Sequence, residues 1–189
     1  MIVQGLDDLL DETLKLIVCL RTRAPGASLP AKLDALFLKL SGSLSSIEAA
    51  ETEDLIWNLW HTHKSTEAED ALDEAARMLA SRDFTLAETR LSMLVNTWPG
   101  FAEAWNKRAT LNYLRRRDKA SVRDIQQVLA IEPRHFGALS GFGQICLRHG
   151  RPAHALSAFE AALKVHPHLA SVKAAVEAVG ADLRERRLR

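Results

Sequence analysis

The chain of 189 residues is 47% hydrophobic and 26% charged, the composition of an ordinary folded domain or of an array of small units. Its apolar runs fall well short of the roughly 20 residues that a membrane-spanning helix needs, so we expect no membrane insertion. Its two cysteines, Cys19 and Cys146, lie far apart in the sequence. This spacing argues against a disulfide framework and favours a reducing compartment, the cytoplasm or an organelle matrix.

Charge is divided unevenly along the chain although the formal net charge is only +1. Residues 1–101 hold 9 Lys and Arg against 16 Asp and Glu, whereas residues 102–189 hold 16 against 8. In an elongated array these charges would lie at opposite ends, much farther apart than the screening length of about 8 Å. The asymmetry predicts a dipolar molecule that self-associates at low salt. The alternative is that both sets of charges only form solvated helix faces.

Three helices are expected at the start of the chain. Residues 6–20 carry a stripe of leucines, with acids in the first turn as the helix dipole prefers. After the breaker APGASLP, Ser28 is expected to cap and Pro30 to open a second helix that runs to Leu40. A third helix with two tryptophans is expected at roughly 46–62, and no later segment alternates as a strand would.

A fixed period organises the rest of the sequence. The dipeptides WP, EP and HP recur at a spacing of 34 residues, with their prolines at Pro99, Pro133 and Pro167. Proline disfavours helical conformation in the residue before it, so each dipeptide marks the end of a helix. A period of this length is typical of repeat architectures. With each proline at place 32 of a unit, the units are 68–101, 102–135 and 136–169.

Residue size also recurs at fixed places of these units. Places 8 and 20 are small, and place 24 is bulky. The residues are Ala75, Ala109 and Gly143 at place 8, Ala87, Ser121 and Ala155 at place 20, and Leu91, Ile125 and Phe159 at place 24. Two antiparallel helices that cross at a short distance need small residues at the crossing and bulky ones beside it. The pattern therefore predicts an all-α fold with one helix pair per unit.

The units resemble the tetratricopeptide repeat (TPR) family. AEAW at 102–105, followed by the small Ala109, and the run GQICLRHGRPAHALSAFEAALKVHP at 143–167 stand close to the family pattern. FAEAWNKRAT and EPRHFGALSG also resemble small bacterial-type members of unassigned function. The resemblance covers residues 68–169 and implies a right-handed superhelical array of antiparallel helix pairs, an α-solenoid. It further implies a noncatalytic protein that binds protein partners and needs no cofactor.

The regions that flank the three units are expected to be helical as well. Residues 170–189 predict a capping helix with an apolar stripe and a basic tail. Residues 1–67 predict an N-terminal helical region, whose first helix caps the acidic end or binds elsewhere. Within it, a degenerate repeat at 34–67 and a nonrepeating helical cap remain open alternatives, because Ser65 stands where the proline is expected.

One pair of charges departs from the family pattern. Place 7, which is normally apolar, holds Glu74 in the first unit and Arg108 in the second. Equivalent helices of stacked repeats are neighbours, so the two side chains could face one another as an ion pair between repeats. The alternative is that both extend their charged ends to water.

The concave surface of the array is the predicted binding site. The candidate peptide-binding residues are Asn106, Lys107, Thr110, Tyr113, Ser140, Gln144 and Arg148. Lys107 and Arg148 favour an extended peptide with acidic side chains, and as surface residues they should tolerate charge reversal. The carboxylate clamp of chaperone-binding TPR members is absent, because Leu72, Ala76 and Gly141 stand where that clamp has Lys, Asn and Arg.

A basic patch points to another possible function, the binding of nucleic acid. It consists of Arg115, Arg116, Arg117, Lys119 and Arg123, around one turn between helices. Such a patch suits a polyanion, but most aromatic residues fall on packing places and few are free to stack on bases, so nucleic acid is the third choice. The histidines lack partners at metal-ligand spacing, and we expect no metal site. A noncatalytic adaptor is therefore favoured, with a structural subunit of a larger assembly as the alternative.

Overall fold

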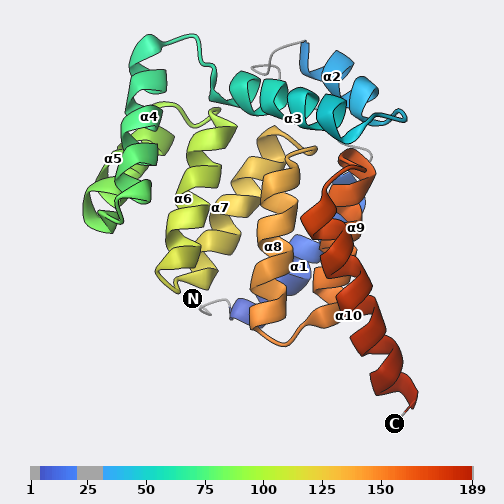
Figure 1. Cartoon of the computed structure of the whole chain (residues 1–189). Helices are drawn as coiled ribbons and strands as arrows, with labels where there is room; N and C mark the ends of the chain where they lie inside the picture. Colours follow the sequence, from blue (N-terminus) through green and yellow to red (C-terminus); the bar gives the residue numbers. More distant parts are fainter. Residues whose placement is uncertain (1–4, 21–31, 189) are drawn as a thin grey trace.

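The computed structural model of the chain describes residues 5–20 and 32–188, which form ten α-helices and no strand (Figure 1). They are α1 (Leu6–Cys19), α2 (Lys32–Leu40), α3 (Ser46–His61), α4 (Thr66–Ala80), α5 (Phe84–Thr97), α6 (Ala102–Leu114), α7 (Asp118–Ile131), α8 (Phe136–Arg148), α9 (Pro152–Val165) and α10 (Ala170–Leu188). The all-α prediction is confirmed. Ser28 and Pro30, expected to start the second helix, lie outside the described residues, as do the side chains of the last three residues.

The helix bounds themselves repeat with a period of 34 residues. The second helices α5, α7 and α9 begin at Phe84, Asp118 and Pro152, and the first helices α6 and α8 begin at Ala102 and Phe136. The residues before the three prolines, Trp98, Glu132 and His166, each end a second helix with ψ values of 71°, 94° and 86°. These values lie outside the helical region, as a following proline requires. The prolines therefore end helices as predicted.

Successive helix pairs α4–α5, α6–α7 and α8–α9 lie side by side and form a helical-repeat solenoid (Figure 1). Gly143 at place 8 shows why this place must be small, because a Cβ there would lie closer than 3.0 Å to three ring atoms of Phe159 at place 24. In the preceding unit the Ser121 hydroxyl at place 20 donates to the Ala109 carbonyl at place 8, over 2.8 Å. The helix α10 covers α9 and buries Val172 and Val179.

The first helix, α1, packs on the second helices α7 and α9, behind α8 in the view of Figure 1. It buries Leu9, Leu10 and Ile17, and its Thr13 hydroxyl accepts a hydrogen bond from Gln126 over 2.8 Å. Because α1 lies along the array, it does not cap an acidic end. Of the two alternatives expected from the sequence, the second is correct, because this helix binds to the second helices of the repeats.

Acidic residues of the N-terminal part lie against basic residues of the C-terminal half. The pairs are Asp7 with Arg151, Asp11 with His154, Asp34 with Arg134, Glu53 with His166, and Glu88 with both Arg115 and Arg117. These acids therefore do not lie at the opposite end from the basic half, as an elongated array would place them. An elongated array would separate these charges, but α1, α2 and α3 fold back on the repeats and bring them together.

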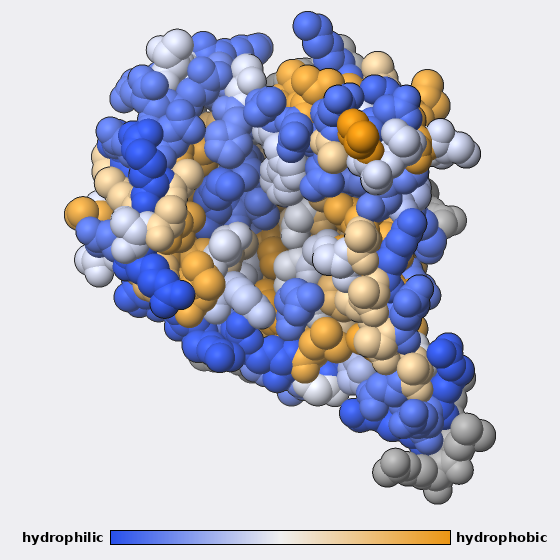
Figure 2. Space-filling model, in the orientation of Figure 1, coloured by the Kyte–Doolittle hydropathy of each residue, from blue (hydrophilic) through white to orange (hydrophobic). Residues whose placement is uncertain are grey.

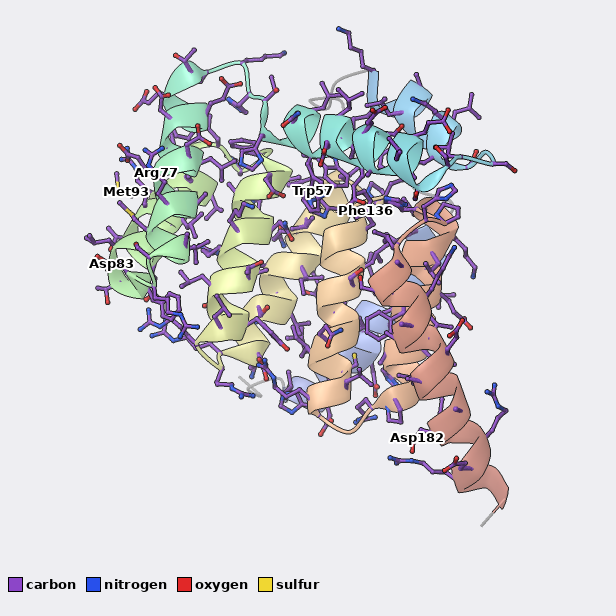
Figure 3. All side chains as sticks on the ribbon, viewed as in Figure 1. Trp57, Arg77, Asp83, Met93, Phe136 and Asp182 are labelled. Atoms are coloured by element: carbon purple, nitrogen blue, oxygen red, sulfur yellow. The ribbon has the colours of Figure 1, made fainter. Side chains whose placement is uncertain are left out.

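The pair α2–α3 lies across the turns that precede α8 and α10, rather than stacking on α4 as α6 stacks beside α8 (Figure 1). Trp57 meets the Phe136 ring edge-on with centroids 5.2 Å apart, and Figure 3 shows both side chains where α3 crosses α8. Trp60 stacks on His135 with the rings 4.0 Å apart. Ser65, which breaks the repeat pattern, caps α4 by accepting the Ala68 N–H.

The ion pair between Glu74 and Arg108, one of the two alternatives from the sequence, does not form. Glu74 instead pairs with Arg90 of α5 over 2.5 Å, and Arg108 pairs with Asp124 of α7 over 2.7 Å. Both pairs join places 7 and 23 of one unit. In the first unit the acid is at place 7 and the base at place 23, and in the second unit the two are exchanged. Place 7 faces the second helix of its own unit, so the contact lies within repeats and not between them.

Candidate functional site

The open face between α6 and α8 contains a small pocket of about 100 Å³. Four of the predicted groove residues line it: Asn106, Thr110, Tyr113 and Gln144. Gly141 of α8 leaves the space beside it open, since the nearest atom to a Cβ there would be Ile125 Cδ1 of α7 at 3.8 Å. Figure 2 shows a hollow in the middle of this face, with less polar residues on its floor than on its rim. The pocket can accept a small apolar group, with amide and hydroxyl groups at its edge.

The other three predicted groove residues are engaged with the chain itself. The Arg148 guanidinium lies 3.6 Å over the Tyr113 ring and 2.5 Å from Asp118 Oδ1. Lys107 Nζ lies 3.1 Å from Glu103 Oε1, and the Ser140 hydroxyl donates to its own helix at Phe136. The expectation that Lys107 and Arg148 are plain surface charges is wrong, because Asp118 and Glu103 are buried partners whose charges they compensate.

A buried polar cluster that the sequence did not reveal closes one end of the groove. Glu103 is fully buried, and its Oε2 accepts hydrogen bonds from Asn106 (2.9 Å) and His135 (3.1 Å). His135 Nδ1 accepts a hydrogen bond from the Ala138 N–H, so Nε2 carries the ring proton and donates the hydrogen bond to Glu103. Burial raises the pKa of Glu103, but its contacts with His135 and Lys107 outweigh burial and lower it.

The tryptophans of α3 explain why Glu103 is buried. Trp60 stacks on His135, and a Cβ at Gly137 would lie 2.8 Å from the Trp57 ring. The repeat pattern predicted an open surface here because it contains no information about α3, which comes from outside the repeats. The pairing of Trp57 and Trp60 with a histidine that follows a proline turn is the one sequence signal that could have pointed to this contact.

The structure brings the residues of the predicted basic patch together, and one carboxylate compensates part of their charge. Arg115 and Arg117 both form ion pairs with Glu88 of α5. Arg116, Lys119 and Arg123 line a surface hollow at the start of α7, which α1 reaches through Leu6. Asp118, in the same turn, is buried and also binds His149 over 2.7 Å. The turn is therefore less positive than its five basic residues indicate.

Other kinds of site find little support in the part of the chain that the structure describes. Residues 5–20 and 32–188 contain no group of three potential ligands that could hold a metal ion. Burial raises the pKa of the Cys146 thiol to about 12, which disfavours the thiolate that a nucleophile needs. In these same residues no helix is long and apolar enough to cross a membrane.

An array of three matched helix pairs with an open groove defines a helical-repeat protein of the kind that binds other proteins. The chain is 32% identical over 150 residues to a TPR repeat-containing protein of Rhizobium etli, an alignment that covers 79% of this chain and 74% of that one. No protein-family model matches the chain. The chain therefore belongs to the tetratricopeptide repeat family.

Proposed function

We propose that the protein is a noncatalytic adaptor that binds an extended segment of a partner protein in the groove between α6 and α8. The observation that carries this proposal is the pocket beside Gly141, where the missing side chain leaves space between two first helices. Asn106, Thr110 and Gln144 surround it with hydrogen-bonding groups. An extended peptide needs such groups for its own backbone and a pocket for one of its side chains.

The same groove supports an acidic partner segment. Lys107 lies toward the α3 end and Arg148 toward the opposite end, and neither side chain is fully buried. A carboxylate arriving at Lys107 would share its ammonium group with Glu103, and one arriving at Arg148 would share the guanidinium with Asp118. Acidic side chains therefore bind at the ends of the groove, and a small apolar side chain occupies the middle.

The test uses two exposed groove residues that carry no ion pair. Thr110→Glu with Gln144→Glu places two carboxylates beside the pocket and should leave the fold intact, because surface substitutions usually change stability by less than about 0.5 kcal/mol. Affinity purification from the native cell with quantitative mass spectrometry should then show loss of the main partner. The matched control, Thr110→Lys with Gln144→Lys, adds equal bulk with opposite charge and should retain an acidic partner.

A different result would support the alternative, a structural subunit that uses its outer and terminal surfaces. In that case the main partner stays bound to the Thr110→Glu, Gln144→Glu variant. Loss of the partner with the lysine pair but not the glutamate pair would contradict the acidic character alone. RNA recovered with the wild-type chain and lost on Arg116→Glu with Arg123→Glu would instead support nucleic-acid binding at the basic patch.

A further inference from the structure

The second helix of each repeat has a flank formed by places 16, 19 and 26, and a different part of the chain lies opposite this flank in each repeat. On α9 the residues at places 16 and 19, Arg151 and His154, bind Asp7 and Asp11 of α1. On α7 the same flank, including Ala120 and Gln127 at places 19 and 26, faces α5 across a hollow. Each of these two flanks thus has a helix opposite it, supplied by this chain.

On α5 the equivalent flank is at the outer edge of the array. Places 19 and 26 are Leu86 and Met93, whose exposed fractions are 53% and 56%. Among the described helices, α4 and α6 make the main contacts with α5. Figure 3 shows Met93 at the outer margin of the α4–α5 pair, and Figure 2 shows apolar residues at that margin. Two large apolar side chains, seven residues apart on one face, therefore stand where α9 has its contacts with α1.

The contact between α1 and α9 indicates what fits on the exposed flank of α5, because there a single helix covers the equivalent flank. Charge then distinguishes the occupants. Residues 66–97 contain seven Asp and Glu against three Arg, and Asp83 stands at place 16, where α9 has Arg151. The first turns of α1 carry Asp7, Asp8, Asp11 and Glu12, so α1 of a second copy would meet like charge.

We propose that this edge, formed by Leu86, Met93 and Asp83, binds a basic amphipathic helix of a partner protein. The helix lies along α5 as α1 lies along α9. Its apolar face covers Leu86 and Met93, and Lys or Arg in its first turns pairs with Asp83. The site is separate from the α6–α8 groove and does not depend on it.

A charge-reversed peptide tests the proposal. It has the sequence of residues 5–20 with Asp7→Lys, Asp8→Lys, Asp11→Lys and Glu12→Lys, and carries a fluorescent dye on its cysteine. Titrated with the full chain, it should bind with rising anisotropy, at least about tenfold more tightly than the unaltered peptide and than a scrambled peptide of equal composition.

Variants of the full chain locate the binding. Leu86→Asp with Met93→Asp should weaken binding by at least about tenfold, and the milder Leu86→Ala with Met93→Ala should weaken it in the same direction. The matched control, Leu38→Asp with Ile47→Asp, alters two exposed apolar residues on α2 and α3 and should leave binding unchanged.

Two results overturn the proposal. One is binding that survives in both Leu86, Met93 variants, or that is equal for the scrambled peptide. The other is a wild-type dimer in sedimentation experiments that becomes a monomer in these variants, because a second copy then covers the edge. Thr110→Glu with Gln144→Glu should have no effect, so that failure here is distinguishable from failure of the groove.

Discussion

Three residues in left-handed conformation join the two helices of the repeats. Arg82, Arg116 and Gly150 have φ values of 60°, 59° and 66°, and each is place 15 of its unit. The turn geometry is thus the same in all three units, but two of them place a Cβ in a conformation that costs about 1–2 kcal/mol. Arg82 and Arg116 are exposed, and no structural reason for an arginine at either place is evident.

Glycine at these two turns should stabilise the fold. Arg82→Gly and Arg116→Gly remove the steric cost of the left-handed conformation. The larger chain entropy of glycine in the unfolded state offsets part of this gain. We expect each to raise the free energy of unfolding by about 0.5–1 kcal/mol in urea denaturation. The reverse change, Gly150→Ala, should lower it by a similar amount. Destabilisation by both arginine replacements would show that the turns are not strained.

Two glycines of α8 should respond to alanine in opposite ways. A Cβ at Gly141 would contact Ile125 at an ordinary 3.8 Å, so Gly141→Ala should gain helix propensity worth up to about 1 kcal/mol. Gly143→Ala should instead destabilise by about 1–3 kcal/mol, because the Phe159 ring would have to move. Thermal denaturation of the two variants measures the difference, and equal effects would contradict the close crossing of α8 and α9.

At the scale of helices, each unit joins its two helices between places 7 and 23. In the second unit Arg108 donates to both carboxylate oxygens of Asp124 over 3.0 and 2.7 Å, and Asn112 donates to the same carboxylate over 2.9 Å. In the third unit these places hold Phe142 and Ala158, both fully buried. The same contact is thus polar in two units and apolar in one.

A double-mutant cycle should find coupling within a unit and not between units. For Arg108→Gln and Asp124→Asn we expect a coupling of about 1–3 kcal/mol, because the carboxylate is nearly buried and the bond is bidentate. The cycle for Glu74→Gln and Arg108→Gln should be additive within about 0.5 kcal/mol, since these side chains have different partners. The opposite outcome would restore the ion pair between repeats.

Docking of α3 should weaken in acid. The hydrogen bond from His166 holds the pKa of Glu53 below its ordinary 4.5, although partial burial raises it. A carboxyl whose pKa is lowered by folding contributes stability above its unfolded pKa, and loses it as pH falls through the lowered value. Unfolding followed by the fluorescence of Trp57 and Trp60 should therefore show falling stability below about pH 4.5.

The variant Glu53→Gln isolates this contribution. It should be less stable than wild type at pH 7, and the difference should shrink as pH falls below the lowered pKa of Glu53. Glu51→Gln, which alters an exposed carboxylate on the same helix, is the control and should keep the wild-type pH profile. A difference between Glu53→Gln and wild type that is constant with pH would rule out the His166 contact as its source.

At the scale of the whole molecule, folding back of the N-terminal helices determines how charge is distributed. Asp7 and Asp11 form ion pairs with Arg151, which directly precedes α9, and Asp34 forms one with Arg134. These contacts compensate within one chain the charges that the sequence separates into two halves. They do not reach the α4–α5 pair, which keeps an excess of acidic residues at the edge of the array.

The mass in solution should therefore be the same at low and high salt. Light scattering at about 20 and about 500 mM salt, ionic strengths with long and short screening lengths, should give one molar mass. Salt should instead lower the stability of α1 docking, because the Asp7 and Asp11 contacts are at the surface and are screened. Larger particles at low salt alone would favour the end-to-end association expected from the sequence.

The sequence by itself determined the features that arise inside a repeat unit. The 34-residue period, the helix ends before the prolines, and the small residue at place 8 against the bulky one at place 24 were all predicted and are observed. They could be read because each depends on residues of one unit, and three units give three independent copies of the same signal. Four of the seven groove residues also line one pocket for this reason, since their places repeat.

Only the tertiary structure decided where the nonrepeating helices go. The contacts of Thr13 with Gln126, Asp34 with Arg134 and Glu53 with His166 join residues about 100 or more positions apart, and each occurs once. No period marks such contacts, because they depend on the shapes and charges of surfaces that exist only after the repeats have folded. The positions of α1 and α3 decide that Glu103 is buried, that one end of the groove is closed and that Leu86 and Met93 stay exposed, which the repeat pattern alone could not indicate.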